Sequence, residues 1–398
     1  MTTEIKNIVL ARMASLLTAH KAELMAANEA DLSSAPKDDP TIIDRLKIDD
    51  KKIEGMIQSL NDTIAKPDPI GVTRYEYQHP QGMRIVNRTA PFGTILIIYE
   101  SRPDVTIEAA ALAFKAGNTI LLKGGKEARR SNLLLVKYWH QALVENKLDF
   151  DLIQYLDYTR DQTTALLQSS STHIDLVVPR GGDALIDMVK SLSSAPVLVS
   201  GRGNNFIYVH AQADLQKALD IIVNSKLHKI SVCNAADKVL FDRNIPTLIP
   251  FIHSVYDIMK KSGVELVGDE SVTQTVPDLN INIDASEQIL YEEFLAKKIM
   301  FGIVHDAEEA IQKINKYSGG HTAVIITRDK AIADQFMESV DAASVIHNAS
   351  SRYTDGGQFG LGAELAISTD KLHHRGPLGL DHLVTNKWYV YGDGQVRH

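Results

Sequence analysis

The sequence predicts an α/β protein made of two parallel sheets, each covered by helices on both faces, and a small separate β element. Short apolar runs such as TILIIY (94–99) and TILLK (119–123) do not alternate with polar residues, which indicates strands buried on both faces. Stretches of helical periodicity follow these runs, as expected for a parallel sheet. The same alternation begins again after Cys233, which indicates a second unit of this kind.

The chain opens with two stretches of helical periodicity, 3–31 and 41–65. The first carries Glu4 and has no continuous apolar core, so we interpret it as a helix packed on a domain and not as a targeting segment. Residues 72–89 alternate, turn at HPQG and continue with MRIV, which predicts a β-hairpin. Because its tips are polar, we expect the hairpin to protrude and to pair with another segment.

The remaining elements follow from the same patterns. In the first unit we expect strands at 94–99, 119–123, 174–178, 196–199 and 206–209, and helices at 104–118, 126–146, 183–192 and 215–228. In the second unit we expect strands at 238–241, 264–268, 299–304, 323–327 and 342–348, and helices at 247–262, 307–317 and 331–340. The last segment, 383–398, is β-rich with polar ends.

Composition narrows the class of protein. The chain has 398 residues, 44% of them apolar and 23% charged, which is ordinary for a globular protein of two or three domains. The net charge of −8 argues against a nucleic-acid or anionic-membrane surface but allows a local basic pocket. A single cysteine excludes an internal disulfide and a multi-thiolate zinc site, and it fits a reducing cytosol. No apolar run approaches the roughly 18 residues of a membrane span, so we expect a cytoplasmic protein.

Two glycine pairs each follow a strand and precede a helix, at GGKE (124–127) and PRGGD (179–183). Both would lie at the carboxyl ends of parallel strands, where open α/β sheets bind ligands. Cations surround the first pair, namely Lys123, Lys126, Arg129 and Arg130, so we expect a phosphate or nucleotide there. The plainer alternative is a solvated helix start. GRGNNF (201–206) lacks the third glycine of a dinucleotide fingerprint and is weak evidence for one.

The segment ISVCNAAD (230–237) holds Cys233, which is either a buried apolar residue or a nucleophile. SRYTDGGQFGLGAE (351–364) has four glycines and no periodicity, so its ordering is costly and we interpret it as a substrate-contacting loop. His373 and His374 are adjacent without nearby carboxylates, so we expect surface residues and no metal.

One resemblance extends over nearly the whole chain and is densest in seven motifs: IIYESRPDVT, AGNTILLKGGKEA, PRGGDALI, SVCNAAD, EEFLAKK, NASSRYTDGGQFGLGAE and LHHRGPLGLDHL. On these motifs the sequence resembles the gamma-glutamyl phosphate reductase family of the aldehyde dehydrogenase superfamily. The resemblance implies an aldehyde dehydrogenase-like fold with two Rossmann-like parallel-sheet domains and a β oligomerisation element. It places an NADP-binding domain at 1–71 and 90–228, a catalytic domain at 229–372, and the oligomerisation element at 72–89 and 373–398.

The resemblance, together with the local patterns and the chemistry of the residues, gives expected roles for individual positions. Cys233 matches the catalytic thiol, and Cys233 N–H or Asn234 is an expected oxyanion donor. Expected cofactor contacts are Lys123, Gly124, Gly125, Lys126, Arg130, Arg180, Gly181, Gly182, Glu293 and Phe294, with Lys123 on the adenine ribose and the Glu-Phe pair near the nicotinamide ribose. Expected substrate contacts are Ser101, Arg102, Arg352, Thr354 and Gly356.

Two departures from the superfamily pattern bear on the reaction. YESRP puts Ser101 where the superfamily has its oxyanion Asn, and LVSGRG lacks the superfamily's catalytic Glu. The resemblance therefore implies NADPH-dependent reduction of gamma-glutamyl phosphate to glutamate 5-semialdehyde through a Cys233 thioester, a step of proline biosynthesis. It implies a homodimer or dimer of dimers, with a possible handover from glutamate 5-kinase. The alternatives are a hydrolytic aldehyde dehydrogenase that releases a free acid, and a non-enzymatic scaffold.

Overall fold

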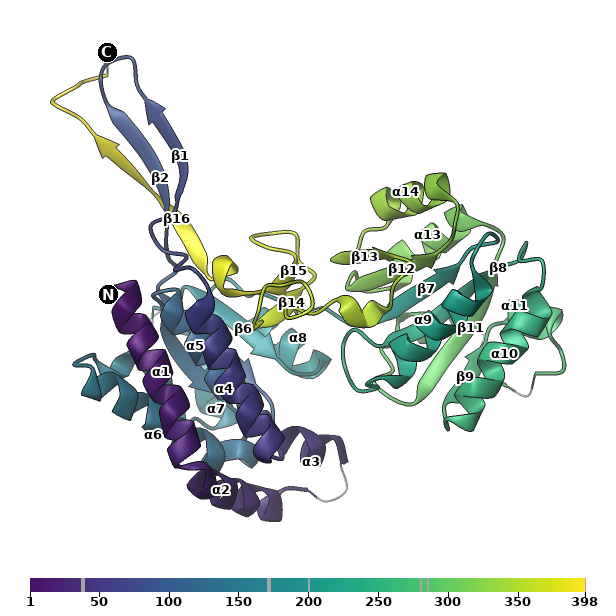
Figure 1. Cartoon of the computed structure of the whole chain (residues 1–398), viewed down its shortest axis with the longest axis horizontal. Coiled ribbons are helices and arrows are strands. Elements are labelled where there is room, and N and C mark those ends of the chain that lie inside the picture. The colour runs from purple at the N-terminus through teal and green to yellow at the C-terminus, as the bar shows by residue number, and fades with distance from the viewer. Residues whose placement is uncertain (37–39, 170–172, 200, 280, 285, 398) are drawn as a thin grey trace. The chain divides into compact units, whose positions relative to one another are not determined.

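The computed structural model describes residues 1–36, 40–169, 173–199, 201–279, 281–284 and 286–397 (Figure 1). The chain forms two compact units, each with its own parallel sheet, so the predicted α/β class is confirmed. The first unit comprises Met1–Val199, Gly360–Ala366 and Leu378–His398, and the second Ser200–Phe359 and Ile367–Pro377. The boundary expected at 228–229 therefore lies near residue 200, because the strand at 205–209 pairs on both sides with strands of the second unit.

The first unit contains a four-stranded parallel sheet in the order β5-β4-β3-β6. Its strands are β3 (Thr94–Tyr99), β4 (Thr119–Lys123), β5 (Ile153–Tyr155) and β6 (Leu176–Arg180). One face packs on α1 (Thr3–Ala19), α4 (Asp50–Ala65), α5 (Asp104–Lys115) and α6 (Arg129–Glu145), and the other on α7 (Arg160–Gln168) and α8 (Asp183–Leu192). Ile95 and Ile97 of β3 enter the first core, and Leu96 and Ile98 the second, so the strand is buried on both faces as its apolar run predicted.

Four predicted elements of this unit differ in the structure. The stretch 3–31 is two helices, because α1 ends before His20 and α2 (Lys21–Ser34) follows; α3 (Pro40–Leu46) likewise precedes α4. Residues 37–39 of the intervening loop lie outside the described residues. The helix expected from 126 begins with a 3₁₀ turn at Lys126–Ala128. The strand expected at 196–199 is only a bridge from Val197 to Val177, since Pro196 has no N–H to extend a ladder.

The second unit contains a seven-stranded parallel sheet in the order β10-β9-β11-β8-β7-β12-β13. Its strands are β7 (Asn205–Val209), β8 (Ala236–Asp242), β9 (Glu265–Gly268), β10 (Asn282–Ile283), β11 (Lys298–Val304), β12 (Thr322–Ile326) and β13 (Ser344–His347). Helices α9 (Leu215–Leu227), α10 (Leu248–Lys261) and α11 (Glu270–Thr275) cover one face, and α13 (Ala307–Tyr317) and α14 (Lys330–Ser339) the other. A short helix, α12 (Glu287–Tyr291), precedes β11.

The small β element is a three-stranded antiparallel sheet that extends beyond the helices of the first unit (Figure 1). The predicted hairpin is confirmed as β1 (Thr73–Gln78) and β2 (Arg84–Pro91). The hairpin pairs with another segment, as expected: β16 (Val384–Tyr391) pairs with β2 of the same chain, from Val384–Pro91 to Tyr391–Arg84. A further pair, β14 (Ala366–Ser368) and β15 (Gly376–Leu378), forms a two-stranded sheet.

Across the described part of the chain, no helix combines the length and the apolar character that a bilayer crossing requires.

Candidate active site

The loop that carries Cys233 joins α9 to β8 in the second unit, and Cys233 is partly exposed there and forms no disulfide. Asn205 fixes this loop: its Nδ2 donates to the carbonyl oxygens of Cys233 and Ala235, both at 2.7 Å. Gly203 lies against the same backbone, since a Cβ there would be 1.9 Å from the Cys233 carbonyl oxygen. GRGNNF therefore supports the cysteine loop, a role that its glycine spacing alone did not reveal.

Residues 350–354 are hydrogen-bonded onto the cysteine loop. Ser351 Oγ donates to the Asn234 carbonyl at 2.6 Å, and Asn234 Nδ2 donates to the Thr354 carbonyl at 2.8 Å. Thr354 is fully buried, and its hydroxyl accepts from Thr322 Oγ1 at 3.0 Å. Sequence reasoning gave Asn234 an oxyanion role and Thr354 a substrate contact. In the structure both side chains join the loop to its neighbours, because backbone carbonyls in a buried turn need donors.

These bonds hold Arg352 close enough to Cys233 for their charges to interact. Its side chain is half-buried, with Nε 3.5 Å from His228 Nδ1. Burial lowers the pKa of Arg352, while the negative charges of Cys233 and Asp355 oppose that shift. A cation next to a cysteine favours the thiolate, which is the nucleophilic form. The structure thus places Arg352, an expected substrate contact, within electrostatic range of Cys233, and it buries Gly356 in the segment that follows.

The Glu293–Phe294 pair lies between α12 and β11 in the same unit as Cys233. Phe294 is only 8% exposed, and its backbone N–H donates to Asp237 Oδ2 at 2.9 Å. The Lys238 ammonium lies 4.0 Å from the centre of the Phe294 ring. Phe294 therefore packs into the interior of the unit, and it does not offer its ring to a ligand at the surface.

Ser101 and Arg102 follow β3 in the first unit. Ser101 is buried and donates to Glu127 Oε2 at 3.3 Å, and Arg102 donates to Asp104 Oδ2 at 3.3 Å. Charged side chains of both signs interact with Glu108 of α5, namely Arg102, Asp104, Arg180 and Glu364, and these five residues are here called the mixed-charge group. Burial raises the pKa of Glu108 to about 7; Asp104 and Glu364 raise it further, while Arg102 and Arg180 lower it. The expected substrate residue Arg102 and the expected cofactor residue Arg180 thus share one electrostatic group.

The first glycine turn packs tightly on its own unit. Lys123 Nζ donates to the Gly124 carbonyl at 2.7 Å, and partial burial lowers the pKa of Lys123. A Cβ on Gly124 would meet Asn132 Nδ2 at 2.3 Å, and one on Gly125 would meet Glu127 Oε2 at 2.8 Å. Gly124 is therefore required by the close approach of the buried Asn132, whereas at Gly125 only the carboxylate at the end of the Glu127 side chain would have to move. Lys123 sits at the carboxyl end of β4 as predicted.

Two arginines beside that turn already have partners. Arg129 Nη2 lies 2.5 Å from Asp157 Oδ2, and Arg130 Nη1 donates to Ser34 Oγ at 2.9 Å and to the Ala30 carbonyl at 3.1 Å. Arg130 thus joins α6 to α2, which differs from the cofactor contact we expected. The sequence could not show this because Ser34 and Arg130 are 96 positions apart.

A carboxylate lies over the second glycine turn. The Gly182 N–H donates to Glu100 Oε1 at 3.3 Å, and a Cβ on Gly181 would lie 2.6 Å from the Glu100 carboxyl carbon. The turn does present a backbone N–H to an anion, as its position after β6 predicted. That anion is the chain's own Glu100, so a cofactor phosphate at Gly181 and Gly182 would face a negative charge.

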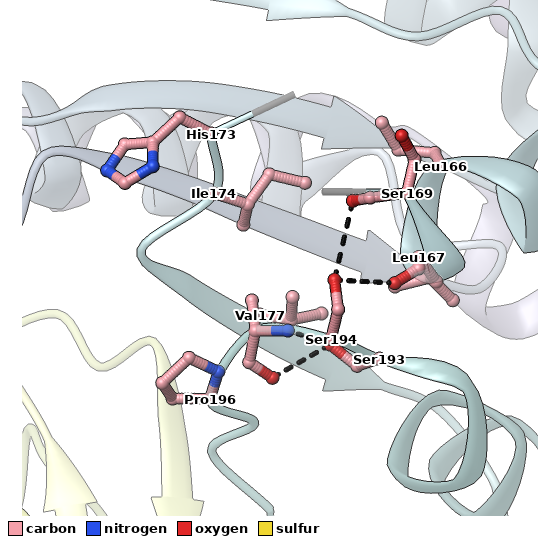
Figure 2. A pocket seen from close by; sticks show the side chains of 10 residues that line it. Leu166, Leu167, Ser169, His173, Ile174, Val177, Ser193, Ser194 and Pro196 are labelled. Carbon is pink, nitrogen blue, oxygen red and sulfur yellow. Dashed lines mark hydrogen bonds between the residues drawn. The ribbon is translucent and has the colours of Figure 1, made fainter. Parts of the chain in front are cut away.

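A pocket of about 210 Å³ lies in the first unit, and none of the expected catalytic, cofactor or substrate residues lines it. Figure 2 shows that it is bounded by the end of α7, the start of β6 and the segment after α8. A hydroxyl group in its wall is hydrogen-bonded within the protein, because Ser194 Oγ donates to the carbonyls of Leu167 at 3.2 Å and Ser169 at 3.3 Å. Among the described residues, no group of three or more His, Cys, Asp or Glu side chains is placed to hold a metal ion.

The fold and the site define the class: an α/β protein of two parallel-sheet units, the second of which carries a thiol that interacts with a guanidinium. A model of the aldehyde dehydrogenase family matches residues 1–275, and the chain belongs to that family. Gamma-glutamyl phosphate reductase from Carboxydothermus hydrogenoformans is 40% identical over 399 residues, covering 100% of this chain and 95% of the relative.

Other comparisons agree. Gamma-glutamyl phosphate reductase from Clostridium perfringens is 40% identical over 356 residues, covering 89% of this chain and 85% of the relative. The crystal structure of gamma-glutamyl phosphate reductase from Thermotoga maritima matches with a TM-score of 0.93 at 38% identity, covering 100% of this chain and 95% of that chain. Within its family, the chain therefore belongs with the gamma-glutamyl phosphate reductases.

Proposed function

We propose that this protein reduces gamma-glutamyl phosphate with NADPH to glutamate 5-semialdehyde and phosphate, a step of proline biosynthesis. The observation that carries the proposal is the partly exposed Cys233 held beside Arg352, in a chain 40% identical over its full length to a gamma-glutamyl phosphate reductase. An acyl phosphate is an activated carboxyl group, and a thiolate is a suitable nucleophile for it.

The first step is acyl transfer to Cys233. The thiolate attacks the acyl carbon, the carbon–oxygen bond to phosphate breaks, and inorganic phosphate leaves with the bonding electron pair. Arg352 lies where a guanidinium can neutralise the anionic leaving group. A nicotinamide cofactor, when bound, would supply the hydride that reduces the thioester carbonyl. Cys233 would serve as the leaving group, departing as thiolate when the aldehyde is released. The Cys233 backbone N–H is the proposed oxyanion donor, since the Asn234 amide is directed to Thr354.

The residues at the end of β4 suit a nicotinamide dinucleotide. Lys123 is half-buried at a strand end and the cation Lys126 follows it, so the donor set fits ribose hydroxyls and phosphate. We propose these two lysines, with the Gly124–Gly125 turn, as the contacts that favour NADPH. Arg130 is left out of this set because it binds α2.

The mixed-charge group after β3 suits the amino-acid end of the substrate, which carries an ammonium and a carboxylate. Arg102 and Arg180 are the proposed partners of the carboxylate, and Glu108 and Glu364 of the ammonium. Planar guanidinium groups match carboxylates bidentately, which favours arginine for this role.

We propose a homodimer or dimer of dimers that associates through the three-stranded sheet, where Tyr75, Tyr77 and Trp388 are exposed. Exposed strand edges recruit other chains, and β1 and β16 form the two edges of this sheet. We place the enzyme in the cytoplasm, where its cysteine stays reduced, and expect a kinase partner to supply the labile acyl phosphate.

The test is NADPH consumption with gamma-glutamyl phosphate generated in situ, followed by the reverse reaction with glutamate 5-semialdehyde and NADP⁺. We expect NADPH formation beyond one turnover only when inorganic phosphate is present. Phosphate-independent turnover that releases free glutamate would favour the hydrolytic alternative. The absence of both NADPH consumption and Cys233 acylation would favour a non-enzymatic scaffold.

A further inference from the structure

The turn that carries Arg352 is hydrogen-bonded to the core of the second unit at both of its ends. It is a single 3₁₀ turn, Ser351–Tyr353, in the loop that follows β13. The backbone N–H of its first residue donates to Ser225 Oγ of α9 at 3.1 Å. Directly after the turn, the hydroxyl of Thr354 accepts from Thr322 Oγ1 at 3.0 Å. The position of the turn is therefore set by side chains from a helix and from a strand.

The position of this turn determines how the guanidinium and the thiol face each other. Ser351 Oγ donates to the Asn234 carbonyl at 2.6 Å. Arg352 follows the first of these residues and Cys233 precedes the second, so the bond keeps the two segments close together. The charges of Arg352 and Cys233 interact, and a cation near a cysteine favours the thiolate. The reactivity of the thiol therefore depends on where the turn is held.

His321 extends the contact at the end of the turn into the interior. The residue is 1% exposed, and its Nδ1 lies 2.8 Å from Thr322 Oγ1. The Thr322 hydroxyl has a single hydrogen, which it donates to Thr354, so the bond from the imidazole must be donated by Nδ1–H. His321, Thr322 and Thr354 are here called the anchor. They form one row of hydrogen bonds that all run in the same direction.

The anchor begins on an interior strand of the sheet. His321 directly precedes β12, which lies between β7 and β13. The His321 carbonyl accepts the Ser344 N–H at 3.0 Å, and Thr322 is paired with Ser344 in the ladder. An interior strand opens less readily than a loop, because its backbone is hydrogen-bonded on both sides. The anchor thus joins the turn to a firmly held part of the unit.

Packing alone does not explain a histidine at position 321. Among the described residues, none pairs with His321 Nε2, although this nitrogen is buried. A buried acceptor without a partner is destabilising, so an apolar ring would suit the position better if only packing mattered. Burial also lowers the pKa of His321 to about 4, so the ring is neutral at pH 7. The evident role of the imidazole is the hydrogen bond that it donates to Thr322.

We propose that His321 is a positioning residue for Arg352: by donating to Thr322 it fixes the end of the turn, and with it the place of the guanidinium relative to the Cys233 thiol. The proposal rests on the proposed reductase function, in which Cys233 attacks as a thiolate. His321 acts only through Arg352 and takes no part in the chemistry. Loss of its Nδ1–H should let the turn shift and make Cys233 less reactive in a protein that is still folded.

The first test is the rate of Cys233 alkylation by iodoacetamide at pH 7, which needs neither substrate nor cofactor. Because a neighbouring cation promotes thiolate formation, Arg352→Met should slow alkylation about tenfold and His321→Phe about fivefold. His321→Asn should stay within about twofold of the wild type, since the asparagine amide can donate in place of Nδ1–H. The pH at which alkylation is half-maximal should rise in His321→Phe and be restored in His321→Asn.

The matched control is His210→Phe. His210 is buried, and its Nδ1 lies 2.7 Å from Thr327 Oγ1, so it makes the same kind of contact as His321. It follows the carboxyl end of β7, whereas the cysteine loop precedes the parallel strand β8 and so lies at the opposite edge of the sheet. His210→Phe should lower Tm comparably with His321→Phe and leave the alkylation rate unchanged.

The decisive experiment is a double-mutant cycle between His321→Phe and Arg352→Met. If His321 acts through Arg352, His321→Phe should slow alkylation no further in the Arg352→Met background. An equal loss in both backgrounds, or a wild-type alkylation rate in folded His321→Phe, would overturn the proposal.

Thr322→Val decides if His321→Phe does not fold, because it removes the same hydrogen bonds and keeps a β-branched side chain on β12. It should slow alkylation about fivefold, and a wild-type rate in this variant would equally overturn the proposal. Failure of the wild type to consume NADPH with gamma-glutamyl phosphate would instead overturn the proposed function. The two failures are distinguishable because alkylation is measured on the enzyme alone.

Discussion

Gly203→Ala tests whether the backbone beneath Cys233 sets the reactivity of the thiol. A Cβ at position 203 would lie 1.9 Å from the Cys233 carbonyl oxygen, 2.5 Å from its carbonyl carbon and 2.6 Å from its Cα. Ordinary contact begins at 3.4 Å, so one of the two backbones must move by about 1.5 Å. Displacement of a reacting group by about 1 Å can cost roughly 100-fold in rate. We therefore expect kcat to fall by about 100-fold or more, equivalent to about 2.7 kcal/mol of activation free energy.

The assay combines kcat with the rate of iodoacetamide alkylation of Cys233, and circular dichroism reports whether the variant is folded. The control is Gly55→Ala in α4, where an added Cβ meets nothing within 4 Å. We expect that control to keep full activity and to gain about 0.5–1 kcal/mol of stability, because alanine is favoured over glycine in a helix. A folded Gly203→Ala protein with wild-type kcat and wild-type alkylation would refute the argument that this close approach positions the thiol.

Four further predictions follow from the site and the fold. Cys233→Ala should fold and lose all turnover, because it is the only cysteine; activity that survives verified alkylation of the wild type would contradict this. The pKa of Glu108 is raised to about 7 from 4.5, so its ionisation in the folded state is unfavourable and stability should fall as pH rises from about 4.5 to 7, by at most about 3 kcal/mol. Glu108→Gln should remove that slope in urea unfolding at several pH values, and an unchanged slope would argue against it. NADPH should exceed NADH at least tenfold in kcat/KM, with Lys126→Ala reducing the ratio; equal values in the wild type would count against a basic phosphate site. Trp388→Arg should weaken self-association in light scattering, and a wild-type monomer at micromolar concentration would exclude the sheet as an interface.

Local patterns were sufficient to predict much of the fold. Buried strands such as 94–99 and 119–123 appeared as continuous apolar runs, because a strand covered on both faces has no polar side. The apolar run at 196–199 was wrongly predicted to be a strand. Pro196 lacks an N–H, and the pairing there is limited to a single bridge. The domain boundary was missed because pairing of β7 with β8 and β12 is non-local and leaves no mark in the sequence around residue 200.

The candidate site also has features that the sequence shows and contacts that only the folded chain shows. By itself the sequence determined that Cys233 is the only thiol, that glycine turns follow β4 and β6, and that a glycine-rich loop follows β13, since these depend on residue type and local order. Only the tertiary structure decided the partners of those residues. Asn234 binds Thr354 across 120 positions, Gly182 donates to Glu100 across 82, and Arg130 joins Ser34 across 96. Whether a polar side chain meets a ligand or its own chain depends on which distant segment folds against it, because each buried donor and acceptor must find a partner in the completed fold.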